Sequence, residues 1–548
     1  MTGLNFKILA QLVSFYSIII NLLLRRSADV LNAMLRITIL FLPVFFITSA
    51  CFAGSVFETK NLLFSMSAYL RQDLVTLKNT LDLDNGNSDD TTTYLGIDYN
   101  LGFNLEAKSG RQKFYLKLER NGPSDYSAPL FMHNTLVTSG GFIDRYRRER
   151  LLPQVEEFWF DTLLPRGLGF KIGLYTYEVG NGIALNGSFE NYGFTIYNQA
   201  KDSLWRFYYC RPELLYKTRH GPHVPQDKEQ GFEHNHSAAN FFAVDARFKL
   251  NKSCFNPYLG ALVDYTSSGK SDNIFTTPPR KDILGTVGSS WELKQDKITF
   301  NLEFAHNFGK ATSEDPAYKD VYHSGYFAYT KLDYQMNKPA PLQRGFVTGF
   351  TPYLQFLLCS GNEVTPEMAQ NQDETLTSAK NRAFSYTSPL NKNLGDSISG
   401  GANSSARPVV AMASGGGINY GLPRPKTFYS SDFENLVIPS LGFILELEKK
   451  ISLGLDAYYL RSFAKPVGTL DGAGKYLSPE LGYELDLFLD YQLNKNILIG
   501  FLGGYFLPGR HYKERRDDTS GSLLNPFVRG DGGADPAYQL ELAMELSF

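Results

Sequence analysis

The last twelve residues of the chain, Ala537 to Phe548, alternate strictly between two kinds of side chain. The first set is apolar throughout and consists of Tyr538, Leu540, Leu542, Met544, Leu546 and Phe548, whereas the second set is polar or small. Successive side chains of a β-strand point to opposite faces of a sheet, so the segment predicts a strand with one apolar and one polar face. Such a strand must place its apolar face against lipid or against a dry core.

The same alternation recurs along most of the chain, most clearly in Tyr94–Lys108. Reading every segment of this kind predicts about 18 strands. We expect them near 62–74, 94–108, 111–121, 154–163, 168–178, 192–199, 203–211, 239–251, 255–266, 283–294, 296–308, 322–336, 345–359, 438–449, 451–463, 480–493, 495–508 and 536–548.

Short and long connections between these strands follow one another without a break. The short ones lie at 109–110, 164–167, 200–202, 252–254, 295, 337–344, 450 and 494. The long ones lie at 75–93, 122–153, 179–191, 212–238, 267–282, 309–321, 360–437, 464–479 and 509–535. Tight periplasmic turns and long extracellular loops produce this order in an up-and-down barrel, whereas a sandwich or a β-helix does not. We therefore predict an all-β fold, a transmembrane up-and-down antiparallel β-barrel in the bacterial outer membrane.

The composition agrees with a barrel of this size and argues against some other classes of protein. The mean hydropathy is −0.23 and the formal net charge is −2. A transmembrane barrel hides its membrane signal in such averages, because every second strand residue faces a wet lumen. The near-zero net charge argues against a partner nucleic acid.

Two apolar stretches precede the barrel. Residues 34–53 contain a short basic start, an apolar core and small residues before Ala53, which predicts a signal peptide and a mature chain of residues 54–548. Initiation at Met34 would leave residues 1–33 as an upstream extension. Two alternatives are a lipoprotein anchored through Cys51 and an inner-membrane protein anchored by two helices.

One family resemblance is carried by the sequence LGYELDLFLDYQLNKNILIGFLGGYFLPG, Leu481 to Gly509, together with VEEFWFD and GFKIGLYTYEVGNGIAL. These fragments resemble the alginate-export family of outer-membrane porins. The resemblance implies a monomeric 18-strand barrel that passes a polyanionic polysaccharide through an arginine-lined constriction. The terminal Phe548 is also typical of outer-membrane barrels, where the barrel-assembly machinery reads it.

Basic residues are the candidates for substrate contacts, because guanidinium groups bind carboxylates bidentately. The densest cluster is DRYRRER, with Arg145, Arg147, Arg148 and Arg150. The inward-facing strand candidates are Arg71, Lys117, Lys171, Arg206 and Arg247. Alternatively, the cluster is part of a solvated loop that contacts lipopolysaccharide, and the strand residues form ion pairs with neighbouring strands of the wall.

Two loops leave further alternatives open. His220, His223, His234 and His236 have a spacing that could ligate zinc, but we expect a solvated loop, no metal and no cofactor. The insertion 360–437 is rich in Gly, Ser and Asn and either enters the lumen or stays outside.

The sequence therefore predicts a channel rather than an enzyme. We expect passive export or diffusion of an acidic exopolysaccharide or a related anionic solute, with outer-membrane lipid and lipopolysaccharide around the barrel. The alternative is a general or small-solute porin. Two hypotheses from other functional classes are an outer-membrane enzyme and a receptor.

Overall fold

Eighteen long β-strands dominate the computed structural model, which describes residues 57–78, 91–120, 131–132, 154–211, 239–264, 280–313, 320–337, 347–361, 380–382, 384, 435–447, 450–470, 473–515 and 534–547. The first nine are β2 (Leu62–Lys78), β3 (Thr91–Ala107), β4 (Gln112–Arg120), β6 (Gln154–Leu163), β7 (Leu168–Val179), β8 (Leu185–Gln199), β9 (Ser203–Arg211), β10 (Ala239–Leu250) and β11 (Ser253–Asp264). The others are β12 (Arg280–Gln295), β13 (Ile298–Ser313), β15 (Tyr326–Tyr334), β17 (Val347–Cys359), β19 (Leu436–Leu447), β20 (Ile451–Ser462), β23 (Glu480–Asn494), β24 (Ile497–Pro508) and β25 (Ala537–Ser547).

The long strands close into a single barrel. Each pairs antiparallel with its neighbours in chain order, as β12 and β13 do from Arg280↔Ser313 to Gln295↔Ile298. The last strand then pairs with the first, from Tyr69↔Ser547 to Lys78↔Tyr538. Closure leaves no unpaired sheet edge among the long strands, which is what a wall in lipid requires. The predicted fold class is confirmed.

Several short elements accompany the long strands. The short strands are β1 (Phe57–Glu58), β5 (Phe131–Met132), β14 (Val321–His323), β16 (Met336–Asn337), β18 (Lys380–Asn381), β21 (Val467–Leu470) and β22 (Ala473–Tyr476), and the one α-helix in the described ranges is α6 (Arg510–Arg515). A 3₁₀ turn covers Pro165–Gly167. None of the helices described in the chain has the length and apolarity needed to cross a membrane.

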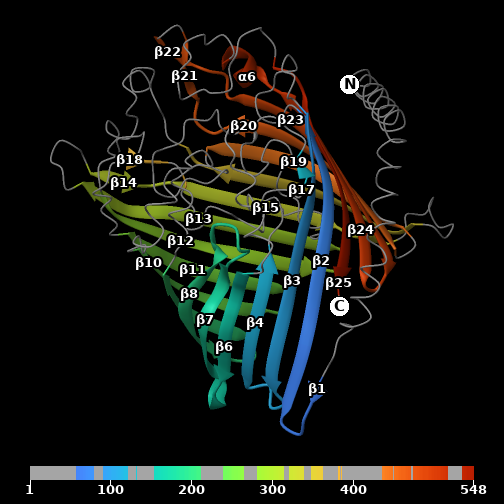
Figure 1. Ribbon diagram of the computed structural model, residues 1–548. Coiled ribbons are helices and arrows are strands. Elements are labelled where there is room, and N and C mark those ends of the chain that lie inside the picture. The colour runs from blue at the N-terminus through green and yellow to red at the C-terminus, as the bar shows by residue number, and fades with distance from the viewer. Residues whose placement is uncertain are drawn as a thin grey trace. The chain divides into compact units, whose positions relative to one another are not determined.

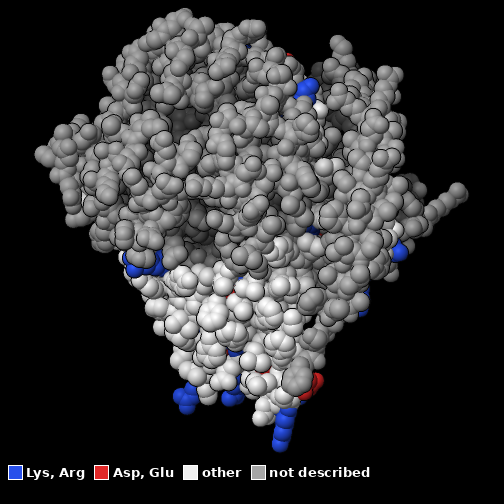
Figure 2. Space-filling model, in the orientation of Figure 1, with Lys and Arg blue, Asp and Glu red and all other residues white. Residues whose placement is uncertain are grey.

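The two faces of the wall are inverted relative to a soluble protein. Large apolar side chains such as Leu354, Leu441 and Phe304 are exposed on one face, whereas Asp245 and Asp456 on the other face are buried. The lower part of the surface in Figure 2 is accordingly almost free of charge until the lower end is reached. An exposed apolar belt around a closed barrel is the surface that lipid covers in proteins of the bacterial outer membrane.

The ends of the barrel can be assigned from its turns. The strands run side by side in Figure 1, and the turns at 108–111, 164–167, 200–202, 251–252, 296–297, 448–450 and 495–496 lie at the same end as β1 and the end of β25. Short turns and chain termini mark the periplasmic end of an outer-membrane barrel. The strand ends that border the longer connections, such as Cys359 and Leu436, therefore lie at the extracellular end.

One predicted connection is wrong. The sequence predicted a long loop over 179–191, but β7 continues to Val179 and β8 begins at Leu185, so only Gly180–Ala184 connects them. The register shifts by a bulge between Tyr175 and Tyr177, and this irregularity interrupts the alternation from which strands were predicted.

A charge on the lipid-facing side gives a first test of this orientation. Leu441 lies within β19, opposite Leu354, and its side chain is 60% exposed. We expect Leu441→Arg to lower the free energy of unfolding in vesicles by about 2–4 kcal/mol, because lipid does not solvate the guanidinium. The same change at Leu493, near the periplasmic end, should cost about 0–1 kcal/mol. Urea titration of both variants measures the difference, and equal costs would contradict the depth assigned to Leu441.

Candidate functional site

The lumen of the barrel is the candidate site, and three of the predicted basic residues already have carboxylate partners there. Arg71 of β2 forms an ion pair with Glu541 of β25 and lies 3.7 Å from Glu545. These contacts cross the seam at which the barrel closes. Lys117 of β4 contacts Glu119 and Glu156, the latter at 3.1 Å. Both side chains face the lumen, and their ion pairs also stabilise the contacts between neighbouring strands.

Arg206 of β9 has the most complete set of contacts among these residues. Its Nε and Nη2 donate to the two carboxylate oxygens of Asp245 at 2.9 and 2.8 Å. Its Nη2 also donates to the backbone carbonyl of Glu178, 3.2 Å away at the end of β7. Such a bidentate pair is geometrically fixed, so Arg206 holds the β7 end in place.

The other two predicted strand cations differ from this pattern. The Lys171 ammonium lies over the rings of Trp159 and Tyr175, at 3.9 and 4.3 Å from their centroids. Arg247 is exposed on the lumen side of β10, in register with Leu204. The five residues are therefore distributed around the wall and do not form one cluster. Arg145, Arg147, Arg148 and Arg150 lie outside the described residues, as does the loop with His220, His223, His234 and His236.

The short connection Gly180–Ala184 turns into the lumen and is held by one carboxyl group. Glu303 of β13 is fully buried and accepts hydrogen bonds from the backbone amides of Asn181 (3.2 Å) and Ala184 (3.3 Å). The Tyr258 hydroxyl donates to the same carboxyl group at 2.7 Å. One side chain thus connects the turn to β11 and β13. We call Gly180–Ala184 the inward turn.

A second chain of contacts holds the start of the inward turn. The Gly180 amide donates to Asn256 Oδ1 at 2.7 Å, and the Asn256 amide donates to Asp245 at 3.0 Å. Asp245 is the partner of Arg206, so the network runs from the inward turn through β11 and β10 to β9. Gly180 has a φ of +66°, and a Cβ there would lie 2.8 Å from Tyr258 and 3.0 Å from Glu303. Only glycine fits this position without moving the network.

Apolar side chains line the lumen at the extracellular end. We call this cluster the apolar collar, and its strand members are Val179, Phe241, Leu262, Leu284, Phe327, Cys359, Leu436, Leu460, Leu481 and Phe506. Further members come from connections: Ile183 and Ala184 of the inward turn, Tyr512 of α6, and Phe384. A lumen wall is typically polar, so this packing indicates that the described parts of these connections enter the extracellular end of the lumen.

Phe384 shows where part of the long insertion 360–437 lies relative to the lumen. The side chain is fully buried and its ring lies 5.4 Å from that of Phe327. The Ser360 hydroxyl donates to the Arg382 carbonyl at 2.6 Å, and the Phe384 amide donates to the Ser360 carbonyl at 3.0 Å. The insertion therefore enters the lumen at Phe384, while most of it lies outside the described residues.

Carboxylates dominate one side of the lumen. We call this set the acidic wall: Glu446, Asp456, Glu484, Asp486, Asp490, Glu541 and Glu545, all on β19 to β25. Asp456 lies directly opposite Asp486, and Tyr458 opposite Glu484. Within β19, β20, β23, β24 and β25, Arg461 is the one basic residue that the structure describes. It is exposed at their extracellular end, in register with the lipid-facing Val437. Among the described residues of these strands, carboxylates therefore outnumber basic groups on this side of the lumen.

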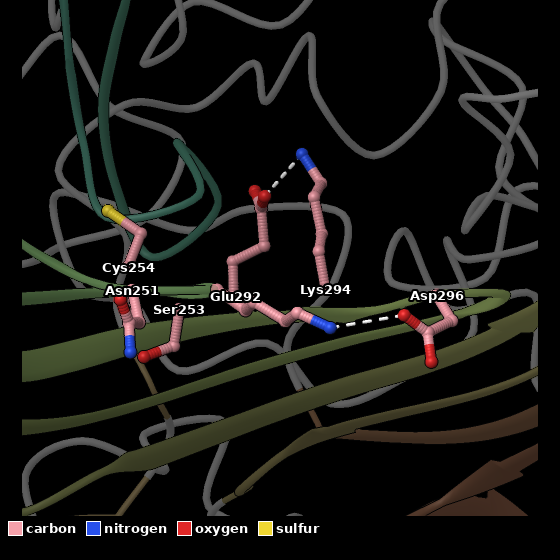
Figure 3. A pocket seen from close by; sticks show the side chains of 7 residues that line it. Asn251, Ser253, Cys254, Glu292, Lys294 and Asp296 are labelled. Atoms are coloured by element: carbon pink, nitrogen blue, oxygen red, sulfur yellow. Dashed lines mark hydrogen bonds and ion pairs between the residues drawn. The ribbon is translucent and has the colours of Figure 1, made fainter.

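A shallow pocket of 390 Å³ lies at the periplasmic rim (Figure 3). Its charged side chains pair with one another, Lys252 with Asp296 at 3.1 Å and Lys294 with Glu292. Cys254 is a single thiol beside them. No group of three or more His, Cys, Asp or Glu side chains in the described ranges is arranged to hold a metal ion. The pocket therefore does not replace the lumen as the candidate site.

Comparisons with known proteins give structural likenesses only. No protein-family model matches the chain, and no curated protein matches its sequence. It is similar to the solved structure of OpdQ from Pseudomonas aeruginosa, with 10% identity and a TM-score of 0.44 over 88% of this chain and 98% of that one. It is also similar to the outer membrane protein OprD from Pseudomonas aeruginosa, with 9% identity and a TM-score of 0.41 over 91% and 95% of the two chains. The assignment of the barrel rests on the strand pairing of this chain itself.

Proposed function

We propose that the protein is a passive channel of the bacterial outer membrane for small water-soluble solutes. The observation that carries this proposal is the closed wall of 18 strands with charged and hydrogen-bonding side chains on its inner face. Barrels of 16 to 18 strands leave an aqueous channel. A solute would exchange part of its water for these side chains and cross without a chemical step.

The charges of the lumen favour cations or neutral solutes over anions. Arg71, Lys117 and Arg206 are engaged by carboxylates of the barrel itself. The acidic wall has no basic residue on its own strands that faces the lumen in the described part. The excess of described carboxylates over described basic groups on this side would favour a permeant cation over a permeant anion.

Export of an acidic exopolysaccharide is the second candidate. The resemblance of Leu481–Gly509, which forms most of β23 and β24, to the alginate-export family favours it. This function would need an arginine-lined constriction, for which Arg145, Arg147, Arg148 and Arg150 are the candidates. Family membership and these residue roles stay predictions.

Planar-bilayer recordings distinguish the two candidates. The protein purified from outer membranes is measured in a KCl gradient, with and without polyuronate. Cation-preferring current that polyuronate does not block would support the small-solute channel. Anion-selective current that polyuronate blocks would overturn it in favour of polysaccharide export. Absence of current in correctly folded protein would reject both forms of open channel.

A further inference from the structure

Basic residues recur in the turns at the periplasmic end of the barrel. Every such turn that the structure describes in full contains at least one exposed lysine or arginine. In the turns between long strands, the cations are Lys108 and Arg111, Arg166, Lys201, Lys252, Lys297 and Lys495, with Lys450 beside β20. Lysine and arginine also mark the lower end of the surface in Figure 2. The positive charge is therefore a property of the whole rim and not of one loop.

Few carboxylates neutralise this charge. Lys108 pairs with Glu58, and its hydrogen bond lowers the pKa of that carboxyl group. Lys252 pairs with Asp296. Asp202 is the one other acidic residue in the described parts of these turns. We call the remaining cations the basic rim: Arg111, Arg166, Lys201, Lys297, Lys450 and Lys495, none of which forms an ion pair within the described part of the barrel.

The basic rim lies where the lipid-facing surface ends. Arg166 stands between Leu164 and Leu168, which are 47% and 44% exposed. Lys297 directly precedes Ile298, which is 42% exposed. Long basic side chains in this position extend from the apolar belt to the level of the lipid headgroups. Because the cations follow the outer perimeter of the barrel, their nearest external anions are headgroup phosphates.

We propose that the basic rim binds the phosphate groups of anionic phospholipids in the periplasmic leaflet. A ring of cations in successive turns would gather such lipids around the whole barrel and fix the depth at which the barrel sits. A polyanion in the periplasm is the competing occupant, because it would meet the same charges on its way to the pore.

The test measures which lipid contacts the barrel. The full protein is reconstituted in phosphatidylcholine vesicles with spin-labelled phosphatidylglycerol or phosphatidylcholine, and the motionally restricted fraction gives the relative association constant. We expect a preference for phosphatidylglycerol of about two- to fivefold at low salt. The preference should fall toward one in about 1 M salt, where the Debye length is about 3 Å.

Variants assign the effect to the basic rim. Replacing its six residues with glutamine should abolish the preference, whereas exchanging each lysine for arginine and each arginine for lysine should retain it. A control with Arg211→Gln, Lys310→Gln and Arg461→Gln removes three cations at the other end and should keep the preference. Heat-modified mobility on gels verifies that each variant is folded.

Three results would overturn the proposal. The first is equal association of both lipids with the wild-type protein, and the second is an unchanged preference in the folded six-residue variant. The third is loss of block by polyuronate, added from the periplasmic side, in that variant while its lipid preference persists. This last result would assign the rim to a polymer. The first two outcomes do not depend on whether the barrel conducts small solutes.

Discussion

Replacing Glu303 with alanine should raise the single-channel conductance severalfold. Glu303 is the shared acceptor for the amides of Asn181 and Ala184 and for the Tyr258 hydroxyl. Alanine leaves these three donors buried without their acceptor, at a cost of about 1–3 kcal/mol for each group. Moving out of the lumen lets water solvate these donors, so it costs the inward turn less free energy than staying in place. The conducting path therefore widens.

Two control variants separate this effect from a general loss of structure. Glu303→Gln keeps one carbonyl oxygen, which can accept from Ala184 and Tyr258, the two donors that share Oε1, and it loses only the acceptor for Asn181. Most of the wild-type conductance should therefore remain. Asp333→Ala removes a carboxylate that pairs with Lys331 at 3.2 Å and does not touch the inward turn. Its conductance should stay close to the wild-type value. If Glu303→Ala fails to fold, Tyr258→Phe removes a single donor and should produce a smaller increase.

Hydrogen exchange gives a second readout for the same prediction. A peptide spanning Val179–Leu185 reports the amides of Asn181 and Ala184, which should exchange faster in Glu303→Ala than in the wild-type protein. Unchanged exchange together with unchanged conductance would show that Glu303 does not hold the turn. Faster exchange without a change in conductance would show that the turn is held by Glu303 but does not limit the pore.

The strands could be predicted because each has one face toward lipid. In β9 and β20 the alternation of apolar and polar residues is long enough to fix both ends almost to the residue. The inward turn could not be predicted in the same way. Ile183, Leu185 and Val179 pack inside the lumen, so an apolar residue there no longer marks the lipid side.

The partners of individual side chains could not be predicted from the sequence either. Alternation placed Arg206 on the lumen side, but it does not show that Arg206 binds Asp245. Nor does it show that Glu303 binds a turn more than a hundred residues away. Lys171 was predicted as a pore cation, whereas the structure places its ammonium against two aromatic rings. Phe384 had no signal, because the surrounding insertion has no strand periodicity. The glycines of GNGIAL were the one available hint of a tight turn.

Neutralising part of the acidic wall should shift the pore away from cations. The triple variant Asp456→Asn, Glu484→Gln and Asp486→Asn removes three carboxylates on the neighbouring strands β20 and β23. A unit charge about 8 Å from an ion in water contributes about 0.5 kcal/mol, so three contribute about 1.5 kcal/mol before screening by salt. The wild-type permeability ratio of K⁺ to Cl⁻ should therefore be about two to ten, and the variant should approach one.

A matched triple variant tests whether position in the lumen matters. Glu58→Gln, Asp202→Asn and Asp296→Asn remove the same number of charges from the exposed periplasmic rim. Bulk water and salt screen these charges, so the permeability ratio should change little. The measurement is the zero-current potential in a KCl gradient, recorded at low and high total salt.

The two triple variants also decide between the proposed functions. A large change for the lumen variant and a small change for the rim variant would place the selectivity at the acidic wall. Equal changes would show that the protein acts through its overall charge and not through the lumen. Anion selectivity in the wild-type protein that survives in the lumen variant would contradict the cation preference. The basic groups that determine the ion selectivity would then lie elsewhere, and Arg145, Arg147, Arg148 and Arg150 would be the next residues to replace.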